Sequence, residues 1–161
     1  MIVYLLEEEI REINRFSLEL TGEGDSFQVV QPDDVRFVIR FVSEQFGKDL
    51  YRKALGYCVS LIVLHPFKNG NHRTSLLCAE RFLQKNDYQS LATDNKRIQL
   101  EKWRLHYEEK HESHREFFRI ANMENNQERG NEIEKLMMSP YGVKIEQWLK
   151  KYIPNGLSHR I

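Results

Sequence analysis

Apolar residues recur at three- and four-residue intervals along most of this chain, which is the spacing that places them on one face of an α-helix. The pattern predicts a first helix over residues 4–20, ended by the two glycines of TGEGDSF. Its expected apolar face consists of Leu6, Ile10, Ile13, Phe16 or Ser17, and Leu20. Pro32 followed by Asp33 and Asp34 is typical of a helix start, because proline suits the first turn and carboxylates suit the positive end of the helix dipole. We expect that second helix to end near Gly47.

The most apolar segment, ALGYCVSLIVL, lies in a third predicted helix over residues 48–64. A helix without a polar face is usually central in a core. Pro66 ends it, because proline has no backbone N–H and disfavours helical geometry in the residue before it. A fourth helix begins near Asn71 and ends at KNDY, so the pattern predicts a central, buried helical hairpin.

The other segments add further helices and one short extended piece. Residues 27–31, FQVVQ, predict a small strand or hairpin arm. Residues 94–106 and 112–121 predict one or two helices, and the polar stretch NMENNQERGN predicts a joint after them. Residues 133–138 and 140–153 predict a last helical pair. We therefore expect an all-α fold.

The composition fits one globular domain, with 40% of the 161 residues hydrophobic and 30% charged. The 24 Lys and Arg residues balance the 24 Asp and Glu residues, so no global field favours nucleic acid or an anionic membrane as a partner. Cys58 and Cys78 lie inside apolar helical patterns, where buried free thiols are expected. The opening MIVYLL is too short for the apolar region of a signal peptide, so we expect a cytoplasmic protein that does not enter a membrane.

The stretch LHPFKNGNHRTSL, between the two central helices, carries the candidate chemistry. His65 leaves the core helix at its end and is suited to act as a general base. Asn71, His72 and Arg73 follow Gly70 and begin the next helix, where unpaired backbone N–H groups favour an anion. Each of these residues also has an ordinary structural use as a helix stop, turn or cap. Together they place a base beside an anion cradle, which suits transfer of a phosphoryl-type group with a metal.

The run HPFKNGNHR resembles the signature of the Fic/Doc (Fido) family, His-x-Phe-x-[Asp/Glu]-[Gly/Ala]-Asn-[Gly/Lys]-Arg, and is nearer its Doc-like branch. The likeness extends more weakly over residues 5–122. It implies a Fic/Doc-like helical bundle with a short β flap at residues 27–31 and the motif between two central helices. We expect this domain to span residues 1–122, with residues 123–161 as a C-terminal helical extension that packs on it or serves association.

The resemblance also implies an activity and roles for individual residues. Family members move AMP or the terminal phosphate from a nucleotide such as ATP onto a hydroxyl of a target protein, on Ser, Thr or Tyr, with Mg²⁺ or Mn²⁺. The resemblance implies that His65 is the base and that Phe67 is an anchor in the core. The residues that would contact the nucleotide are Gly70, Asn71, His72 and Arg73. Asn71 and Arg73 would also be catalytic, and Asn69 would be a weak metal ligand. The flap would align the target segment by strand addition.

Three positions depart from the family pattern. Asn69 stands where the family usually has a carboxylate, and an amide brings no charge to a metal. His72 replaces a glycine or lysine, and Leu76 stands where AMP transferases carry a second arginine. The alternative is therefore a degenerate, non-catalytic Fic-like protein that binds nucleotide or a protein partner. The self-inhibitory motif Ser/Thr-x-x-x-Glu-[Gly/Asn] is not found, so a separate antitoxin is kept as a candidate partner.

Three other features have structural alternatives. His106, His111 and His114 could share a helix face and bind zinc, but the Glu- and Lys-rich surroundings favour a solvated face. The stretch NKRIQLEKWR could attract nucleic acid, although we favour a surface helix with Trp103 half-buried. The last helices, with Met137, Met138 and Trp148, could pack on the domain or form the contact of a homo-oligomer.

Overall fold

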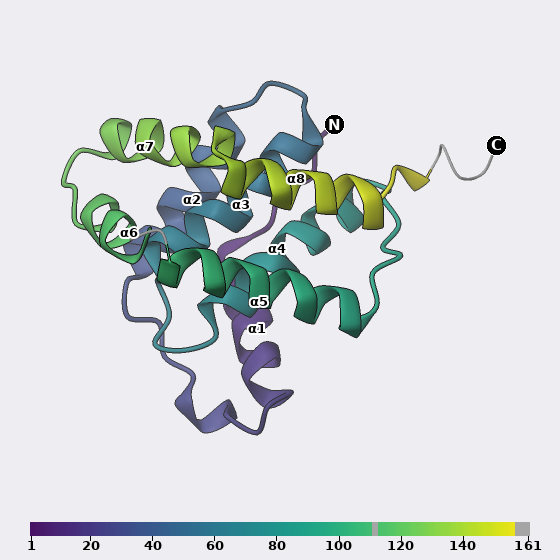
Figure 1. The fold of residues 1–161 in the computed structure, drawn as a ribbon, viewed down its shortest axis with the longest axis horizontal. Coiled ribbons are helices and arrows are strands. Elements are labelled where there is room, and N and C mark those ends of the chain that lie inside the picture. The colour runs from purple at the N-terminus through teal and green to yellow at the C-terminus, as the bar shows by residue number, and fades with distance from the viewer. Residues whose placement is uncertain (111–112, 157–161) are drawn as a thin grey trace.

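The computed structural model describes residues 1–110 and 113–156. Helices dominate these residues, as the apolar pattern predicts, and the all-α fold class is confirmed (Figure 1). In chain order the elements are α1 Glu7–Glu19, the 3-10 helix η1 Gly24–Ser26, α2 Pro32–Glu44, α3 Leu50–Leu64, α4 Asn71–Lys85, α5 Asp94–Lys110, α6 Ser113–Ala121, α7 Asn126–Met138 and α8 Pro140–Tyr152.

The predicted central hairpin is α3 and α4, and α3 is the core of the molecule. Every residue of α3 from Lys53 to Leu64 is buried. The helices α2, α4, α6, α7 and α8 all contact it. Figure 1 shows α7 and α8 running one after the other above α5, with α1 at the opposite end of the molecule. The connection between α3 and α4 therefore starts from a fixed, buried platform.

Residues at the start of α3 cap that helix and also bind the carbonyl oxygens at the end of α2. Asp49 accepts the backbone N–H of Arg52 at 3.1 Å and caps α3. Lys53 is buried, and its Nζ donates to the carbonyl oxygens of Val42 at 2.8 Å and Gln45 at 2.7 Å. A cation at the carbonyl end of a helix is favourable, so this lysine stabilises the end of α2 from inside the core.

The inward face of α1 differs from the predicted one. It consists of Ile10, Asn14, Ser17 and Leu18. Phe16 and Leu20 are 54% and 62% exposed. The helix turns these two polar residues inward because Asn14 hydrogen-bonds to Asn69 O in the α3–α4 connection and Ser17 hydrogen-bonds to Thr74 in α4. A larger apolar side chain could not make these bonds.

The expected β flap is reduced to a single β-bridge, between Val29 and Phe67. The backbone N–H groups of Val30 and Gln31 both donate to Pro66 O, at 2.9 and 3.0 Å. Lys68 N donates to Gln28 O at 2.9 Å. Because η1 and α2 leave only a few residues between them, this segment cannot form a hairpin and instead fastens onto the α3–α4 connection.

Of the two C-terminal helices, α7 begins earlier than the pattern predicts, whereas α8 begins at Pro140 as predicted. Six of the ten residues of the expected polar joint NMENNQERGN belong to α7, where Asn125 caps the helix by accepting the N–H of Glu128 at 3.0 Å. The joint was misassigned because the first turns of α7 expose polar residues and carry little apolar periodicity. Within the described residues, no helix is both long enough and apolar enough to cross a membrane.

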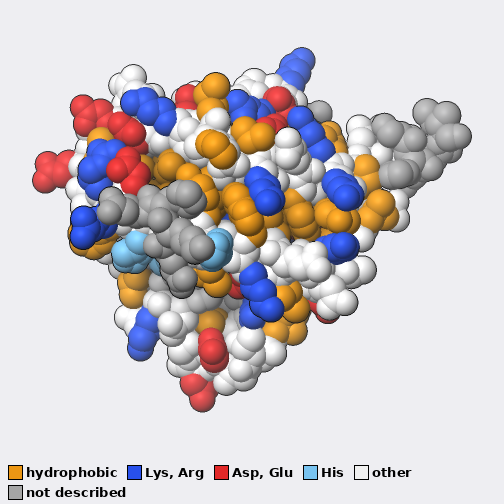
Figure 2. Space-filling model, viewed as in Figure 1, with side chains coloured by type: hydrophobic (Ala, Val, Ile, Leu, Met, Phe, Trp, Pro, Cys, Tyr) orange, Lys and Arg blue, Asp and Glu red, His pale blue; other side chains and the backbone are white. Residues whose placement is uncertain are grey.

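Both terminal helices pack on α3, through Ile133, Met137, Tyr141, Ile145 and Leu149. The outer side of α8, with α5, forms a shallow groove of about 380 Å³. The groove is lined by Trp103 and Trp148 together with several lysines. Figure 2 shows hydrophobic and basic side chains side by side along this face. Association through the C-terminal helices stays a prediction.

Candidate active site at the α3–α4 loop

His65 ends α3 in an unusual backbone conformation. Its N–H still donates to Leu61 O at 3.1 Å, but its own φ and ψ are 48° and 57°, in the left-handed region. Residues other than glycine adopt this region infrequently, and such positions are often functional. The turn leaves His65 exposed between two buried neighbours, Leu64 and Pro66.

The surroundings of His65 favour its neutral form. Protein atoms around the ring lower the pKa of His65, although part of the side chain is accessible to water. A hydrogen bond with the backbone of Ile62 partly opposes this effect, and His114 adds to it. The ring is thus uncharged near neutral pH, which is the form that can accept a proton.

The loop after His65 is held by its own side chains. Phe67, only 2% exposed, is the predicted anchor in the core. Asn71 is also buried; its Oδ1 accepts the N–H of Phe67 at 3.0 Å and its Nδ2 donates to Phe67 O at 2.8 Å. The side chain of Asn71 therefore fixes the loop, and what this residue offers an anion is its backbone N–H.

Gly70 brings the loop against α1. Its φ is +76°, and a Cβ there would lie 3.2 Å from atoms of Asn14, Ser17 and Leu18. Asn14 Nδ2 donates to Asn69 O at 2.9 Å and to Thr74 Oγ1 at 3.0 Å. Glycine is needed at position 70 because the loop packs closely against α1, not because a ligand approaches the backbone there. Polar residues on an otherwise apolar helix face were the available sequence signal for this contact.

The first turn of α4 faces a hollow of about 370 Å³. Thr74 N donates to Gly70 O at 2.9 Å, so the N–H groups of the three residues before Thr74 have no carbonyl of their own helix to bind. No side chain caps this end of α4. The hollow is bordered by His65, Asn69, Gly70, Asn71, His72 and Arg73, together with Ser17 and Glu101. The structure thus brings the predicted site residues other than Phe67 to one place.

Arg73 borders this hollow from the α1 side. Its Nη1 donates to Ser17 O at 2.9 Å, near the carbonyl end of α1. This bond uses one of the five N–H donors of the guanidinium. The side chain is held beside the hollow with donors to spare.

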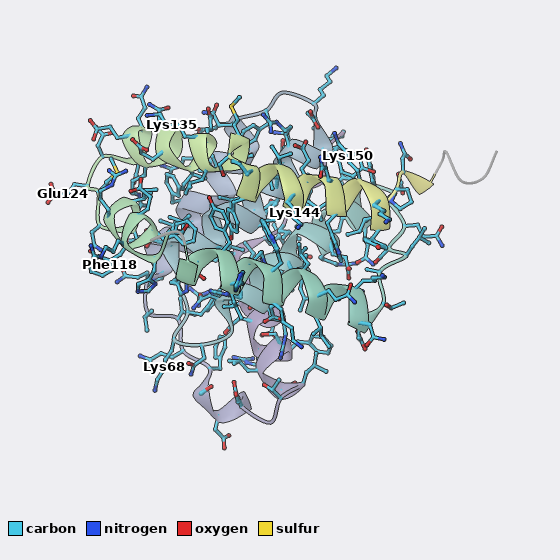
Figure 3. All side chains as sticks on the ribbon, in the orientation of Figure 1. Lys68, Phe118, Glu124, Lys135, Lys144 and Lys150 are labelled. Atoms are coloured by element: carbon cyan, nitrogen blue, oxygen red, sulfur yellow. The ribbon has the colours of Figure 1, made fainter. Side chains whose placement is uncertain are left out.

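Asn69 is exposed at the rim of the same hollow, one residue after Lys68, which points outward (Figure 3). Mg²⁺ is usually held through one or two carboxylates and substrate phosphates. The loop supplies one neutral amide oxygen instead. These residues do not by themselves fit a protein-held Mg²⁺, and we derive no step through such an ion.

The side chain of His72 reaches toward α5. Its Nε2 lies 3.2 Å from Oε2 of Glu108, and its ring meets the ring of His65 edge to face with centroids 5.3 Å apart. Burial, helped by Arg104 and His65, lowers the pKa of His72 to about 3. The neutral ring can then donate its Nε2–H to the carboxylate. The sequence pattern gave no sign that Glu108 belongs to the site.

Arg104 is likewise part of the site's support. It is 1% exposed, and its guanidinium donates to His72 O and to Ser75 Oγ, both at 2.7 Å. Arg97, from the same basic stretch, makes a bidentate contact with Glu80. Trp103 is half-buried and stacks on Tyr141 with ring centroids 5.7 Å apart. Two basic side chains of NKRIQLEKWR, Arg97 and Arg104, therefore make contacts within the fold.

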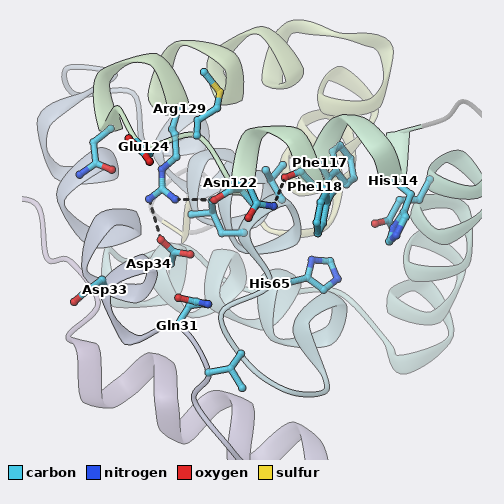
Figure 4. Close-up of a pocket in the computed structure, with 17 residues that line it drawn as sticks. Gln31, Asp33, Asp34, His65, His114, Phe117, Phe118, Asn122, Glu124 and Arg129 are labelled. Carbon is cyan, nitrogen blue, oxygen red and sulfur yellow. Dashed lines mark hydrogen bonds and ion pairs between the residues drawn. The ribbon is translucent and has the colours of Figure 1, made fainter.

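A second, larger hollow of about 750 Å³ opens on the other side of His65. Figure 4 shows the His65 ring between an ion pair of Asp34 with Arg129 and the α6 residues Phe118 and His114. Arg129 Nη2 and Asp34 Oδ1 are 2.9 Å apart. His65 is thus accessible from two directions.

Of the three histidines considered for zinc, His106 is exposed on α5 and His114 is exposed on α6, while His111 lies outside the described residues. His106 and His114 therefore share no helix face, because α5 ends at Lys110 and α6 begins at Ser113. Their exposure agrees with the solvated surface that the sequence favoured.

Comparison with family models identifies the chain. The model described as the Fic/DOC family matches residues 4–83, which run from just before α1 almost to the end of α4. The chain belongs to the Fic/DOC family. Comparison with curated proteins and with solved structures gave no match. The helices α5 to α8 lie outside the matched residues, and the expected domain boundary at residue 122 stays a prediction.

Proposed function

We propose that this Fic/DOC protein transfers a phosphate-containing group from a nucleotide such as ATP to a hydroxyl of a target protein. The observation that carries the proposal is that His65, Arg73 and the first turn of α4 border one hollow. A base, a guanidinium and unpaired N–H groups are the parts that phosphoryl-type transfer requires.

In the proposed reaction, a Ser, Thr or Tyr hydroxyl of the target gives its proton to the neutral ring of His65. The hydroxyl oxygen forms a bond to phosphorus, and the bond from phosphorus to the leaving phosphate oxygen breaks. The leaving group carries away the electron pair of that bond. The N–H groups at the start of α4 and the Arg73 guanidinium stabilise the negative charge that develops there.

The two hollows give the two substrates separate approaches to His65. The nucleotide phosphates would bind at the start of α4, in the smaller hollow. The target hydroxyl would reach His65 through the larger hollow, past Gln31 and the 69% exposed ring of Phe118. The segment that was expected to be a flap would thus line the target's entrance with Val30 and Gln31.

Leu76 favours terminal-phosphate transfer over AMP transfer. It lies one turn after Arg73 on α4 and is 3% exposed, packed into the core. The second guanidinium that the resemblance associates with AMP transfer is therefore missing at this position.

Labelled ATP tests both the activity and the group transferred. The protein is incubated with Mg²⁺ or Mn²⁺, cell lysate, and ATP labelled on either its α- or its γ-phosphate. We expect γ-label on a target protein, its loss in His65→Ala, and its retention in the control His106→Ala, which changes an exposed histidine of α5. No transfer of either label, or equal labelling by His65→Ala, would contradict the proposal.

The non-catalytic alternative has one observation in its favour, the neutral amide of Asn69 at the rim of the hollow. It predicts that calorimetry detects nucleotide binding while neither label is transferred. Labelling that appears only after Asn69→Asp would support this alternative, because the carboxylate restores a charged ligand for the cation that accompanies ATP.

A further inference from the structure

Three side chains with metal-binding atoms converge from three elements at the α3–α4 loop. They are His65 at the end of α3, His72 in the first turn of α4, and Glu108 near the end of α5. One ligand atom of each lies within 4.8 Å of the others. Two imidazoles and a carboxylate on separate elements form a compact donor set that the resemblance does not account for.

The spacing is close to that around a bound ion. Zinc lies about 2.0–2.2 Å from nitrogen and oxygen ligands, so its tetrahedral ligands are about 3.4 Å apart. His72 Nε2 and Glu108 Oε2 are already 3.2 Å apart. Because no separation exceeds 4.8 Å, the widest one must close by at most about 1.4 Å to reach the tetrahedral value. The exposed side chain of His65 can make that movement by rotation.

The donor chemistry selects the kind of ion. Imidazole nitrogen favours zinc and related transition ions, whereas Mg²⁺ favours oxygen ligands alone. We infer that His65, His72 and Glu108 form a binding site for Zn²⁺ or a similar divalent transition-metal ion. Three protein ligands leave a fourth position for water or a substrate oxygen.

The surroundings of His72 are compatible with this role. Glu108 is 7% exposed and supplies the negative charge, while Arg104 holds His72 in place through the carbonyl oxygen. Among the described residues, no hydrogen-bond partner is found for the buried Nδ1 of His72. A small rotation of the ring toward the ion would therefore break no hydrogen bond at that nitrogen.

Binding would have a consequence for catalysis. A ring nitrogen of His65 that ligates the ion is no longer available to accept the proton of the target hydroxyl. The ion would therefore inhibit transfer reversibly. This consequence rests on the proposed function, whereas the binding itself does not.

Binding is tested on the full chain with Zn²⁺ by calorimetry and with Co²⁺ by its visible absorption. We expect one equivalent to bind, and Glu108→Gln to weaken binding at least about tenfold, as the loss of a supporting metal contact typically does. The matched control is His106→Ala, on the same helix as Glu108 but outside the cluster. Absence of binding, or equal weakening in both variants, would overturn the inference.

A second readout needs no variant. In the wild-type protein, Zn²⁺ should shift the ring NMR signals of His65 and His72 and leave those of His106 unchanged; the reverse pattern would overturn the site. If transfer activity is found, Zn²⁺ should inhibit the wild type but not Glu108→Gln. Binding without any transfer activity would refute the proposed function alone, and transfer without binding would refute the metal site alone.

Discussion

His65 and His72 lie ring against ring, but the protein treats them differently. His65 is exposed and lines both hollows. Its left-handed backbone conformation directs the chain out of the core at this residue. His72 is enclosed by the elements around the loop, with Arg104 behind it and Glu108 at its Nε2. The pKa of both rings is lowered, but His65 is exposed, whereas the side chain of His72 is only 16% exposed.

The charge state of His72 can be measured through stability. Its pKa is lowered to about 3, below the unfolded value of about 6.5. Between these values the unfolded chain binds a proton that the native protein does not, so stability falls as the pH falls. Between pH 7 and pH 5, in chelator, wild type should lose about 2 kcal/mol more of its free energy of unfolding than His72→Gln. Equal losses would mean that folding does not lower the pKa of His72, and a smaller loss in the wild type would mean that His72 forms a charged pair with Glu108.

The sequence predicts the residues of the motif but not all of their partners. HPFKNGNHR marks the loop because its residue types carry recognisable chemistry close together in the chain. Glu108 and Asn14 meet that loop only through folding, from positions far away in sequence. A glutamate in a charged stretch has no local pattern that reveals such a contact. A polar residue on an apolar helix face indicates that it has a polar partner, but not which one.

At the level of elements, α1 acts as a support for the loop. Asn14 binds the carbonyl of Asn69, and the end of α1 accepts a hydrogen bond from Arg73. Gly70 permits this packing, because any side chain there would meet Ser17 and its neighbours at 3.2 Å. The position of the loop therefore depends on a helix about fifty residues earlier in the chain.

Replacement of Gly70 tests this support. Gly22→Ala is the control, since Gly22 also has a positive φ, +74°, but its added Cβ would meet nothing within 4 Å. The backbone conformation alone should make Gly22→Ala cost about 1–2 kcal/mol of unfolding free energy. Gly70→Ala should cost at least about 1 kcal/mol more, from overpacking against α1. Equal losses of unfolding free energy in the two variants, measured by urea denaturation, would show that contact with α1 does not restrict the residue at position 70.

Helical periodicity predicts elements well where apolar residues mark the buried face, as in α3 and α4. It fails at the first turns of α7, which expose polar residues, and at residues 27–31, where β-branched composition suggests a strand. Composition cannot show that those residues have only the α3–α4 loop to pair with. Tertiary pairing, rather than local preference, decides their structure.

At the level of the whole molecule, the residues beyond the family match complete the core. Tyr51 Oη donates to Ile153 O at 3.0 Å, and Arg129 pairs with Asp34. Ile145 and Leu149 are fully buried against the rest of the core. The helices α7 and α8 should therefore unfold together with α3.

Substitutions on α8 test this cooperativity. Ile145→Ala should lower the free energy of unfolding by about 3 kcal/mol, because it removes a fully buried side chain. Val143→Ala, on the same helix but 40% exposed, should change it by less than about 1 kcal/mol. Near- and far-ultraviolet circular dichroism should follow one common transition in both variants. A separate transition in Ile145→Ala, under milder denaturing conditions than the main one, would mean that α8 unfolds independently of α3.

The central claim is that the start of α4 binds the phosphates of a nucleotide beside His65. Titration of ¹⁵N-labelled protein with ATP tests it directly, by the shifts of assigned backbone amide signals. The account predicts the largest shifts at Asn71, His72 and Arg73, with smaller ones at Ser17 across the same hollow. Shifts confined to the larger hollow, around Asn122 and Glu124, or no shifts at all, would contradict it.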